Sequence, residues 1–335
     1  MLWWVVAVVA IVVFYGLRKF FEGQKVDGFE EKPVLITGCD TGFGYQTVMK
    51  CAAQSIPVFA ACLTQQGADN LKKESKKLPG KVFAFVMNVT SDESVGKALT
   101  YVEKEVKENK YKGLHGIVCN AGILGKTGPF DWHTTNDYKN VFEVNVFGVI
   151  RTVEHFKELV KKMEGRIVIT ASVCGRVALP LIGGYTASKF AVEGFADNLR
   201  YDMAGFGVSV VTVEPGFFKT PITDSKSILT AIKKVYASVK PEIQAQYGEK
   251  TVNFITSVTQ DQLHNNSSEK THLVVDSYYK ALTSRWPYTR YNAGLDAHLV
   301  YIPISYLSSA VLCFIIDIFG MIKGAPKIVG IKKSN

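Results

Sequence analysis

Short apolar runs alternate with longer helical patterns from residue 30 to residue 292 of this sequence. Each apolar run is nearly continuous, which is typical of strands that are buried on both faces. Such an alternation predicts an α/β fold: a single Rossmann-like, doubly wound parallel sheet with helices on both faces. The expected strands are 33–37, 57–63, 82–89, 114–119, 166–171 and 208–213, and the expected helices are 45–54, 68–77, 93–109, 137–163 and 185–206.

An apolar segment precedes this domain. Residues 1–17 carry no charged side chain and are followed by Arg18 and Lys19. As a helix, 17 residues rise about 25 Å, near the lower limit for crossing a bilayer. The segment lacks the basic start and the Ala-x-Ala-like site of a cleaved signal peptide, so we predict an N-terminal membrane anchor.

A second apolar stretch, 299–316, lies in the C-terminal residues 293–335 and contains Pro303. It could span a bilayer, lie in the interface or cap a hydrophobic pocket, and we expect membrane association without a complete span. Arg18 and Lys19 favour a cytosolic body. Overlapping glycosylation sequons at Asn265 and Asn266 leave a lumenal body open.

Composition argues against two other classes of function. The net charge is +9, but the lysines are dispersed along helical stretches and mixed with glutamate, as on solvated helix faces. No basic aromatic patch appears, so nucleic acid is not an expected partner. The six cysteines have no metal-ligand spacing, so we predict buried free thiols and no metal site.

A glycine-rich turn follows the first expected strand. Its glycines are Gly38, Gly42 and Gly44, in the pattern T-G-x-x-x-G-x-G. Small residues let the backbone approach a pyrophosphate, and the start of the next helix offers unpaired N–H groups. We therefore predict a dinucleotide site here, to which Thr37, Asp40 and Phe43 also belong. A tight turn without a ligand is the alternative.

Polar residues also follow the later expected strands, where open α/β sheets bind ligands. Asn120, Ala121 and Gly122 end the fourth strand, and Ser172 ends the fifth. Tyr185 and Lys189 follow Ser172 and are spaced by one helical turn. The same spacing recurs at Tyr15/Lys19 and Tyr236/Lys240, which lack this setting. Asn145 lies inside an apolar helical stretch, where a buried amide needs a partner.

These motifs, in this order, resemble those of the short-chain dehydrogenase/reductase family. Longer stretches such as "EVNVFGVIRT" and "NLRYDMAGFGVSVVTVEPGFFKTP" resemble the branch that holds microsomal retinol dehydrogenases, hydroxysteroid dehydrogenases and 3-hydroxybutyrate dehydrogenase. The resemblance covers about residues 33–292 and is weakest at both ends. It implies an NAD(P)-dependent alcohol oxidoreductase at the endoplasmic reticulum membrane. The family resemblance also implies a homo-oligomer.

The resemblance also implies roles for the site residues. Tyr185 would be the acid and base that exchanges a proton with the substrate hydroxyl, and Lys189 would stabilise its phenolate and hold the nicotinamide ribose. Ser172 would bind the substrate oxygen, and Asn145 would support a water chain to the lysine. Further expected cofactor contacts are Asn88, Pro215, Gly216 and Thr220.

The cofactor is expected to be NAD. The second expected strand ends in "CLTQQG", which has neither the acid that binds the ribose hydroxyls of NAD nor the base that favours the phosphate of NADP. Asp40 in the glycine turn would repel a 2′-phosphate, which favours NAD. Asn88 stands where the family often has aspartate, which makes the adenine contacts less secure.

The membrane-like ends and the aromatic C-terminal third predict a hydrophobic alcohol, a hydroxysteroid or retinol, taken from or near lipid. A small hydroxy acid such as 3-hydroxybutyrate is an alternative, and its carboxylate would need a cation such as Arg176. A catalytically idle NAD-binding membrane scaffold is another alternative. The presence of Asn145, Ser172, Tyr185 and Lys189 together argues against idleness.

Overall fold

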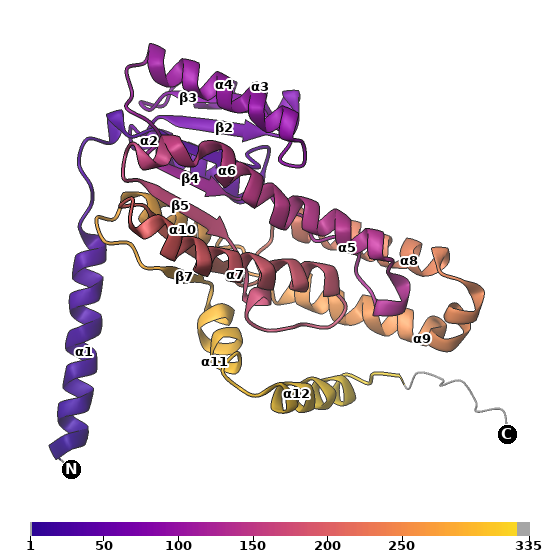
Figure 1. Cartoon of the computed structure of the whole chain (residues 1–335). Coiled ribbons are helices and arrows are strands. Elements are labelled where there is room, and N and C mark those ends of the chain that lie inside the picture. The colour runs from indigo at the N-terminus through magenta and orange to yellow at the C-terminus, as the bar shows by residue number, and fades with distance from the viewer. Residues whose placement is uncertain (1, 327–335) are drawn as a thin grey trace.

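The computed structural model describes residues 2–326, and a seven-stranded sheet forms its centre (Figure 1). Every neighbouring pair of strands is parallel, and the order is β3-β2-β1-β4-β5-β6-β7. This confirms the predicted doubly wound sheet. The strands are β1 Val34–Thr37, β2 Val58–Cys62, β3 Val82–Val86, β4 Gly116–Cys119, β5 Arg166–Thr170, β6 Ser209–Pro215 and β7 Arg290–Ala293.

Two apolar cores lie on opposite faces of the sheet because successive strand residues point to opposite sides. One core contains Leu35, Phe59 and Ile117 and is covered by α4 Asp92–Glu108, α6 Gly148–Lys161 and α7 Gly183–Ala204. The other contains Ile36, Val58 and Val118 and is covered by α2 Gly42–Ala53, α3 Gln65–Ser75 and α10 His272–Thr283. The predicted coverage of both faces is thus confirmed.

The strand β7 was not predicted. Its four residues, "RYNA", alternate between partly exposed and buried positions instead of forming an apolar run. It is held in the sheet by parallel pairing with β6, from Thr212↔Arg290 to Pro215↔Ala293. Because it has no apolar run, this edge strand is recognisable only from its pairing with β6.

The predicted helix 137–163 is confirmed as a helical segment, but one of its turns is π-helical. It consists of α5 Thr135–Phe142, a π-helical turn at Glu143–Phe147, and α6. Asn145 lies in the π-helical turn and is fully buried. π-Helical turns are frequent at functional sites because the extra residue re-aims one side chain.

A helical hairpin, α8 Ser225–Ser238 and α9 Pro241–Gln260, lies between β6 and α10 in the sequence. Its buried residues Ile232, Val235, Val252 and Ile255 pack with Trp132 from the loop after β4. In Figure 1 the hairpin extends beyond the sheet. It forms a small apolar cluster of its own outside the main cores.

Both ends of the chain expose apolar side chains. The first helix, α1 Leu2–Gly23, runs past Arg18 and Lys19, and Trp3 and Trp4 are exposed. After the π-helical turn Ala297–Tyr301 and the short α11 Ile302–Ile304, the helix α12 Ser309–Ile322 has no buried residue. Within residues 2–326 no helix is both long and apolar enough to cross a membrane. The predicted anchor is therefore not confirmed. Residues 327–335 of the predicted C-terminal segment lie outside the described residues.

Five cysteines are buried free thiols, as predicted, but Cys313 is exposed. The prediction for Cys313 was wrong because its apolar surroundings in the sequence belong to α12, which packs on no core.

Candidate functional site

The glycine turn between β1 and α2 depends on the absence of side chains. Gly38 and Gly42 have positive φ angles of 69° and 63°. A Cβ on Gly44 would lie 2.3 Å from the carbonyl oxygen of Gly38, so only glycine lets α2 start this close to the strand. Thr41 precedes α2 but makes no side-chain hydrogen bond to it. The N–H groups at the start of α2 therefore remain available to an anion.

The end of β4 is joined to the same turn by hydrogen bonds. The backbone N–H groups of Asn120 and Ala121 each donate to the Thr37 hydroxyl at 3.0 Å. The amide Nδ2 of Asn120 donates to the carbonyl oxygens of Thr37 (2.9 Å) and Gly38 (3.0 Å). The side chains of Asn120 and Thr37 thus hold the two strand ends together and shape the turn.

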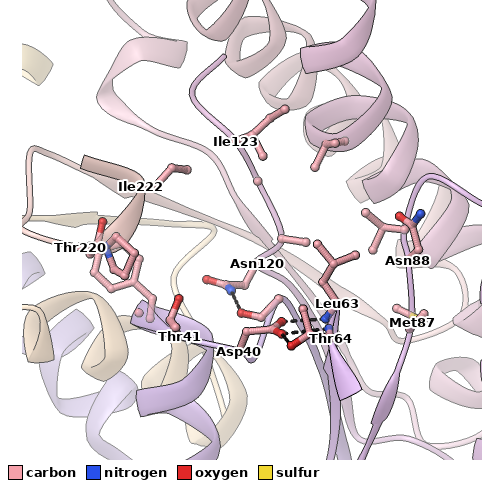
Figure 2. Close-up of a pocket in the computed structure, with 18 of the residues that line it drawn as sticks. Asp40, Thr41, Leu63, Thr64, Met87, Asn88, Asn120, Ile123, Thr220 and Ile222 are labelled. Atoms are coloured by element: carbon pink, nitrogen blue, oxygen red, sulfur yellow. Dashed lines mark hydrogen bonds between the residues drawn. The ribbon is translucent and has the colours of Figure 1, made fainter. Parts of the chain in front are cut away.

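A cavity of about 400 Å³ opens at this edge of the sheet (Figure 2). Figure 2 shows Asp40, Asn88, Asn120 and Thr220 around it. It is lined by these predicted cofactor residues: Gly38, Asp40, Gly42, Phe43, Asn88, Asn120, Ala121, Gly122 and Thr220. The other predicted cofactor residues do not line this cavity within the described part of the chain: Thr37, Gly44, Tyr185, Lys189, Pro215 and Gly216. Lining residues that the sequence analysis missed are Thr41, Leu63, Thr64, Met87, Val89, Thr90, Ile123, Val144, Pro221 and Ile222.

The carboxylate of Asp40 reaches from the glycine turn to the end of β2. It accepts hydrogen bonds from the N–H of Leu63 (2.7 Å), the N–H of Thr64 (3.0 Å) and the Thr64 hydroxyl (2.7 Å), drawn in Figure 2. Gly67 leaves room for it, since a Cβ there would lie 2.4 Å from Oδ1. The structure thus supplies the acid that the sequence of β2 lacks, from a residue 23 positions earlier.

Tyr185 and Lys189 lie in the first two turns of α7. Lys189 is 4% exposed, and its Nζ lies 5.6 Å from the centroid of the Tyr185 ring. The same Nζ donates to the carbonyl oxygen of Thr170 at 2.7 Å, at the end of β5. The lysine is therefore anchored to the sheet, beside the tyrosine.

The pKa values of this pair shift in directions that the sequence argument did not anticipate. Burial raises the pKa of the Tyr185 phenol, Cys174 adds to the rise, and interaction with the Ser172 hydroxyl opposes it. Burial lowers the pKa of Lys189 to about 8, while Cys174 and Glu193 oppose that change. Loss of solvation is the largest cause of both shifts, and it favours the uncharged form of each side chain.

Ser172 and Asn145 position the loops around this pair. The Ser172 hydroxyl accepts a hydrogen bond from the N–H of Cys174 at 3.1 Å, so it also caps a short turn. The Asn145 side chain bonds both backbone groups of Ile123, at 2.8 and 2.9 Å, and donates to the Ser188 hydroxyl at 3.0 Å. This buried amide explains the π-helical turn, since it links the loop after β4 to α7.

The turn after β6 is held by residues that the sequence analysis did not select. The N–H of Gly216 donates to the carbonyl oxygen of Ala293 at 2.8 Å, and the N–H of Phe217 donates to Asp296 at 2.7 Å. A Cβ on Gly216 would lie 2.2 Å from the Asp296 carboxylate. The predicted Pro215 and Gly216 are thus fixed by β7 and the residues that follow it.

An apolar cluster lies against Tyr185 on the side of the C-terminal segment. Its buried members are Val173, Cys174 and Ala297, and the partly exposed side chains around them are Leu179, Ile182, Tyr185, Phe217 and Tyr301. The rings of Phe217 and Tyr301 lie 5.6 Å apart. Tyr301 belongs to the predicted C-terminal segment, so part of that segment packs beside the tyrosine.

Arg176, the cation considered for a substrate carboxylate, has a protein partner. Its Nη1 lies 3.3 Å from Oε1 of Glu214, a fully buried residue. Glu214 therefore neutralises part of the charge of Arg176, which weakens the attraction of Arg176 for a substrate carboxylate. This geometry does not favour a small hydroxy acid.

The chain is similar to known proteins over most of its length. A family model described as short chain dehydrogenase matches residues 32–228. Dehydrogenase/reductase SDR family member 9 from Homo sapiens is 38% identical over 94% of this chain and 96% of its own. The 17-beta-hydroxysteroid dehydrogenase type 6 from Rattus norvegicus is 38% identical over 92% of this chain and 95% of its own. Retinol dehydrogenase 16 from Homo sapiens is 36% identical over 94% of this chain and 95% of its own.

A similar fold occurs among solved structures. A short-chain dehydrogenase from Streptomyces avermitilis aligns with a TM-score of 0.63 at 20% identity, over 88% of this chain and 99% of its own. At this identity the likeness supports the fold.

Proposed function

The chain belongs to the short-chain dehydrogenase family and is an alcohol oxidoreductase with a nicotinamide cofactor, and we propose that it acts on an apolar secondary or allylic alcohol. The alcohol would be a hydroxysteroid or retinol, interconverted with its carbonyl, with NAD as the hydride carrier. One observation carries this proposal: Tyr185 lies beside the anchored Lys189 and packs against an apolar cluster.

The residues at the sheet edge fit a dinucleotide. A Cβ on Gly42 would face open space, with only Pro221 within 4 Å, at 3.8 Å, so the backbone there is accessible from the cavity. The start of α2 would bind the pyrophosphate, and Asp40 would bind the ribose hydroxyls. When bound, the cofactor supplies hydride transfer, and this chain supplies binding, orientation and the proton.

Tyr185 is proposed to transfer that proton to and from the substrate oxygen. The phenol, whose pKa is raised by burial, carries its proton at neutral pH and would donate it to a carbonyl oxygen in the reduction direction. In the oxidation direction its phenolate would accept the proton of the substrate hydroxyl. The Ser172 hydroxyl, close enough to lower the pKa of the phenol, would bind the same oxygen. Lys189 would favour the phenolate once the proton has left, as long as its own amine stays charged.

The substrate class rests on the apolar cluster and on the relatives. Phe217 and Tyr301 add two aromatic rings to the apolar cluster against which Tyr185 packs, which suits a large apolar ring system better than a small acid. The relatives are named for hydroxysteroids and retinol. The exposed Phe314, Phe319 and Met321 of α12 support the further proposal that the protein associates with lipid, from which such alcohols would be taken.

The test is a substrate panel with the full chain and lipid vesicles. Retinol, 3-hydroxysteroids, 17-hydroxysteroids and 3-hydroxybutyrate are supplied with NAD or NADP, and kcat/KM is measured for each. We expect one apolar alcohol to stand out and the protein to sediment with the vesicles. Preference for 3-hydroxybutyrate would overturn the substrate class, and no turnover of any compound by a protein that binds NAD would favour the idle scaffold.

We expect Asp40→Asn to weaken the preference for NAD over NADP. Two unit charges 4 Å apart interact by about 4 kcal/mol at an effective dielectric of about 20. Removing this carboxylate should therefore raise the NADP/NAD ratio of kcat/KM by at least about tenfold, even from a larger distance. The control is Asp69→Asn, an exposed residue of α3 that bonds only the Gln65 side chain. An unchanged ratio in Asp40→Asn would show that Asp40 does not select the cofactor.

A further inference from the structure

A cluster of charged side chains lies behind the catalytic helix, outside the function proposed above. Glu193 is on α7, one helical turn after Lys189, and is 6% exposed. Glu214 is on β6 and is fully buried, immediately before the turn at Pro215. Arg290, the first residue of β7, faces both of them. The cluster therefore joins the catalytic helix to the strand that carries the predicted cofactor turn.

Arg290 is the main donor in this cluster. Its Nη1 bonds Oε2 of Glu193 and, at 2.6 Å, Oε1 of Glu214. Its Nη2 bonds both carboxylate oxygens of Asp197 at 2.6 and 2.7 Å. Arg176 adds a weaker contact to the same Oε1 of Glu214. Each of the two glutamates thus has one oxygen satisfied by a guanidinium.

The other oxygen of each glutamate has no donor. Within residues 2–326, Oε1 of Glu193 and Oε2 of Glu214 are buried and make no hydrogen bond. The two side chains are nevertheless close enough to interact directly. Buried polar atoms are almost always paired, and two ionised carboxylates in contact repel each other. A single proton between them would satisfy both oxygens and remove the repulsion.

We propose that Glu193 and Glu214 share one buried proton, and that Glu193 is a positioning residue for Lys189. The shared proton keeps α7 and β6 bound to each other and leaves the pair with one negative charge. That charge lies one helical turn from Lys189 and favours its ammonium form, because opposite charges stabilise each other across a dry interior. The link to Lys189 rests on the proposed function, whereas the shared proton does not.

The electrostatic environment agrees with this geometry. Burial and then the charge of Glu214 raise the pKa of Glu193 to about 8, with Arg290 opposing them. The titratable and charged groups around the pair lie on α7, on the loop after β5 and on β7: Lys189, Asp197, Arg200, Cys174, Arg176 and Arg290. Arg176 in turn faces the ring of Tyr306, 6.0 Å away.

The direction of the pH effect follows from the raised pKa. An ordinary glutamate loses its proton near pH 4.3, so the unfolded chain releases this proton first. The folded protein keeps it up to about pH 8. The stability that the pair contributes therefore falls as the pH rises from about 4.3 to about 8, and is constant above that.

The test uses Glu193→Gln, whose amide N–H donates to Glu214 at every pH in place of the shared proton. The melting temperature is measured from pH 5 to pH 9 for the wild type, for this variant and for the exposed control Glu154→Gln. We expect the melting temperature of Glu193→Gln to rise relative to that of the wild type by about 6 °C between pH 5 and pH 8, after which the difference stays constant. The control should follow the wild type.

If both glutamates are ionised and paired with Arg290, Glu193→Gln instead lowers the melting temperature at every pH, and the proposal is wrong. Glu214→Gln places the same amide on the opposite side, so it repeats the test if the first variant fails to fold.

The double variant Glu193→Gln/Glu214→Gln leaves the pair without charge. It should move the alkaline limb of the kcat/KM profile to lower pH, because Lys189 loses its proton more easily.

An unmoved alkaline limb in the double variant would overturn the role assigned to Glu193 near Lys189. Inactivity of every protein, the wild type included, would instead contradict the proposed function. In that case the melting curves would still decide whether the proton is shared.

Discussion

Replacing Tyr185 by phenylalanine is expected to lower kcat by about 100- to 10,000-fold, the usual contribution of a positioned acid and base. The phenylalanine ring preserves the packing against Val173, Cys174 and Ala297 and removes only the hydroxyl. Binding of NADH should persist, because Tyr185 does not line the cavity at the glycine turn. The measurements are kcat with the best alcohol of the panel and NADH affinity by fluorescence.

The matched control is Tyr236→Phe. Tyr236 and Lys240 have the same spacing, but the Tyr236 hydroxyl donates to the carbonyl oxygen of Gln244 at 2.9 Å in the helical hairpin. This variant should keep the wild-type kcat. Near-normal activity of Tyr185→Phe would show that another group moves the proton.

Replacing Arg290 by methionine is expected to reduce the free energy of unfolding by about 3 to 5 kcal/mol, the usual cost of breaking a buried ion pair from one side. Arg290 is the guanidinium that Glu193, Glu214 and Asp197 share. Without it, Glu214 keeps only the longer contact to Arg176. Denaturant unfolding of the full chain measures the loss.

Arg285→Met is the control for a surface pair. Arg285 lies 3.4 Å from Asp27, and the two side chains are 51% and 92% exposed. Such pairs contribute about 0 to 1 kcal/mol. Equal, small losses in both variants would mean that solvent screens the Arg290 cluster as it screens the surface.

Local sequence patterns predicted most of the strands and the glycine turn, because each pattern depends on interactions between residues that are close in the sequence. Continuous apolar runs marked six of the seven strands, since a strand buried on both faces has few polar positions. The glycine pattern predicted the turn, because Gly38 and Gly42 need positive φ angles and Gly44 has no room for a side chain. The resemblance drawn from the motifs was confirmed by the family model and by the relatives.

Features that depend on residues far apart in the sequence were not predicted. The strand β7 has no apolar run, and only pairing with β6 defines it. The π-helical turn at Asn145 arises because a loop 22 residues earlier bonds its amide. The shifts in the pKa values of Tyr185 and Lys189 depend on burial, which spacing along a helix does not reveal.

The sequence by itself determined the family, the order of the first six strands and of the helices between them, and the identity of the polar residues at the strand ends. Only the tertiary structure decided which of those residues meet. Asp40 reaches the end of β2 across 23 positions, and Arg290 reaches Glu193 across 97. The physical reason is that periodicity and turn chemistry act between near neighbours, whereas ion pairs and solvation depend on strands that the whole sheet brings side by side.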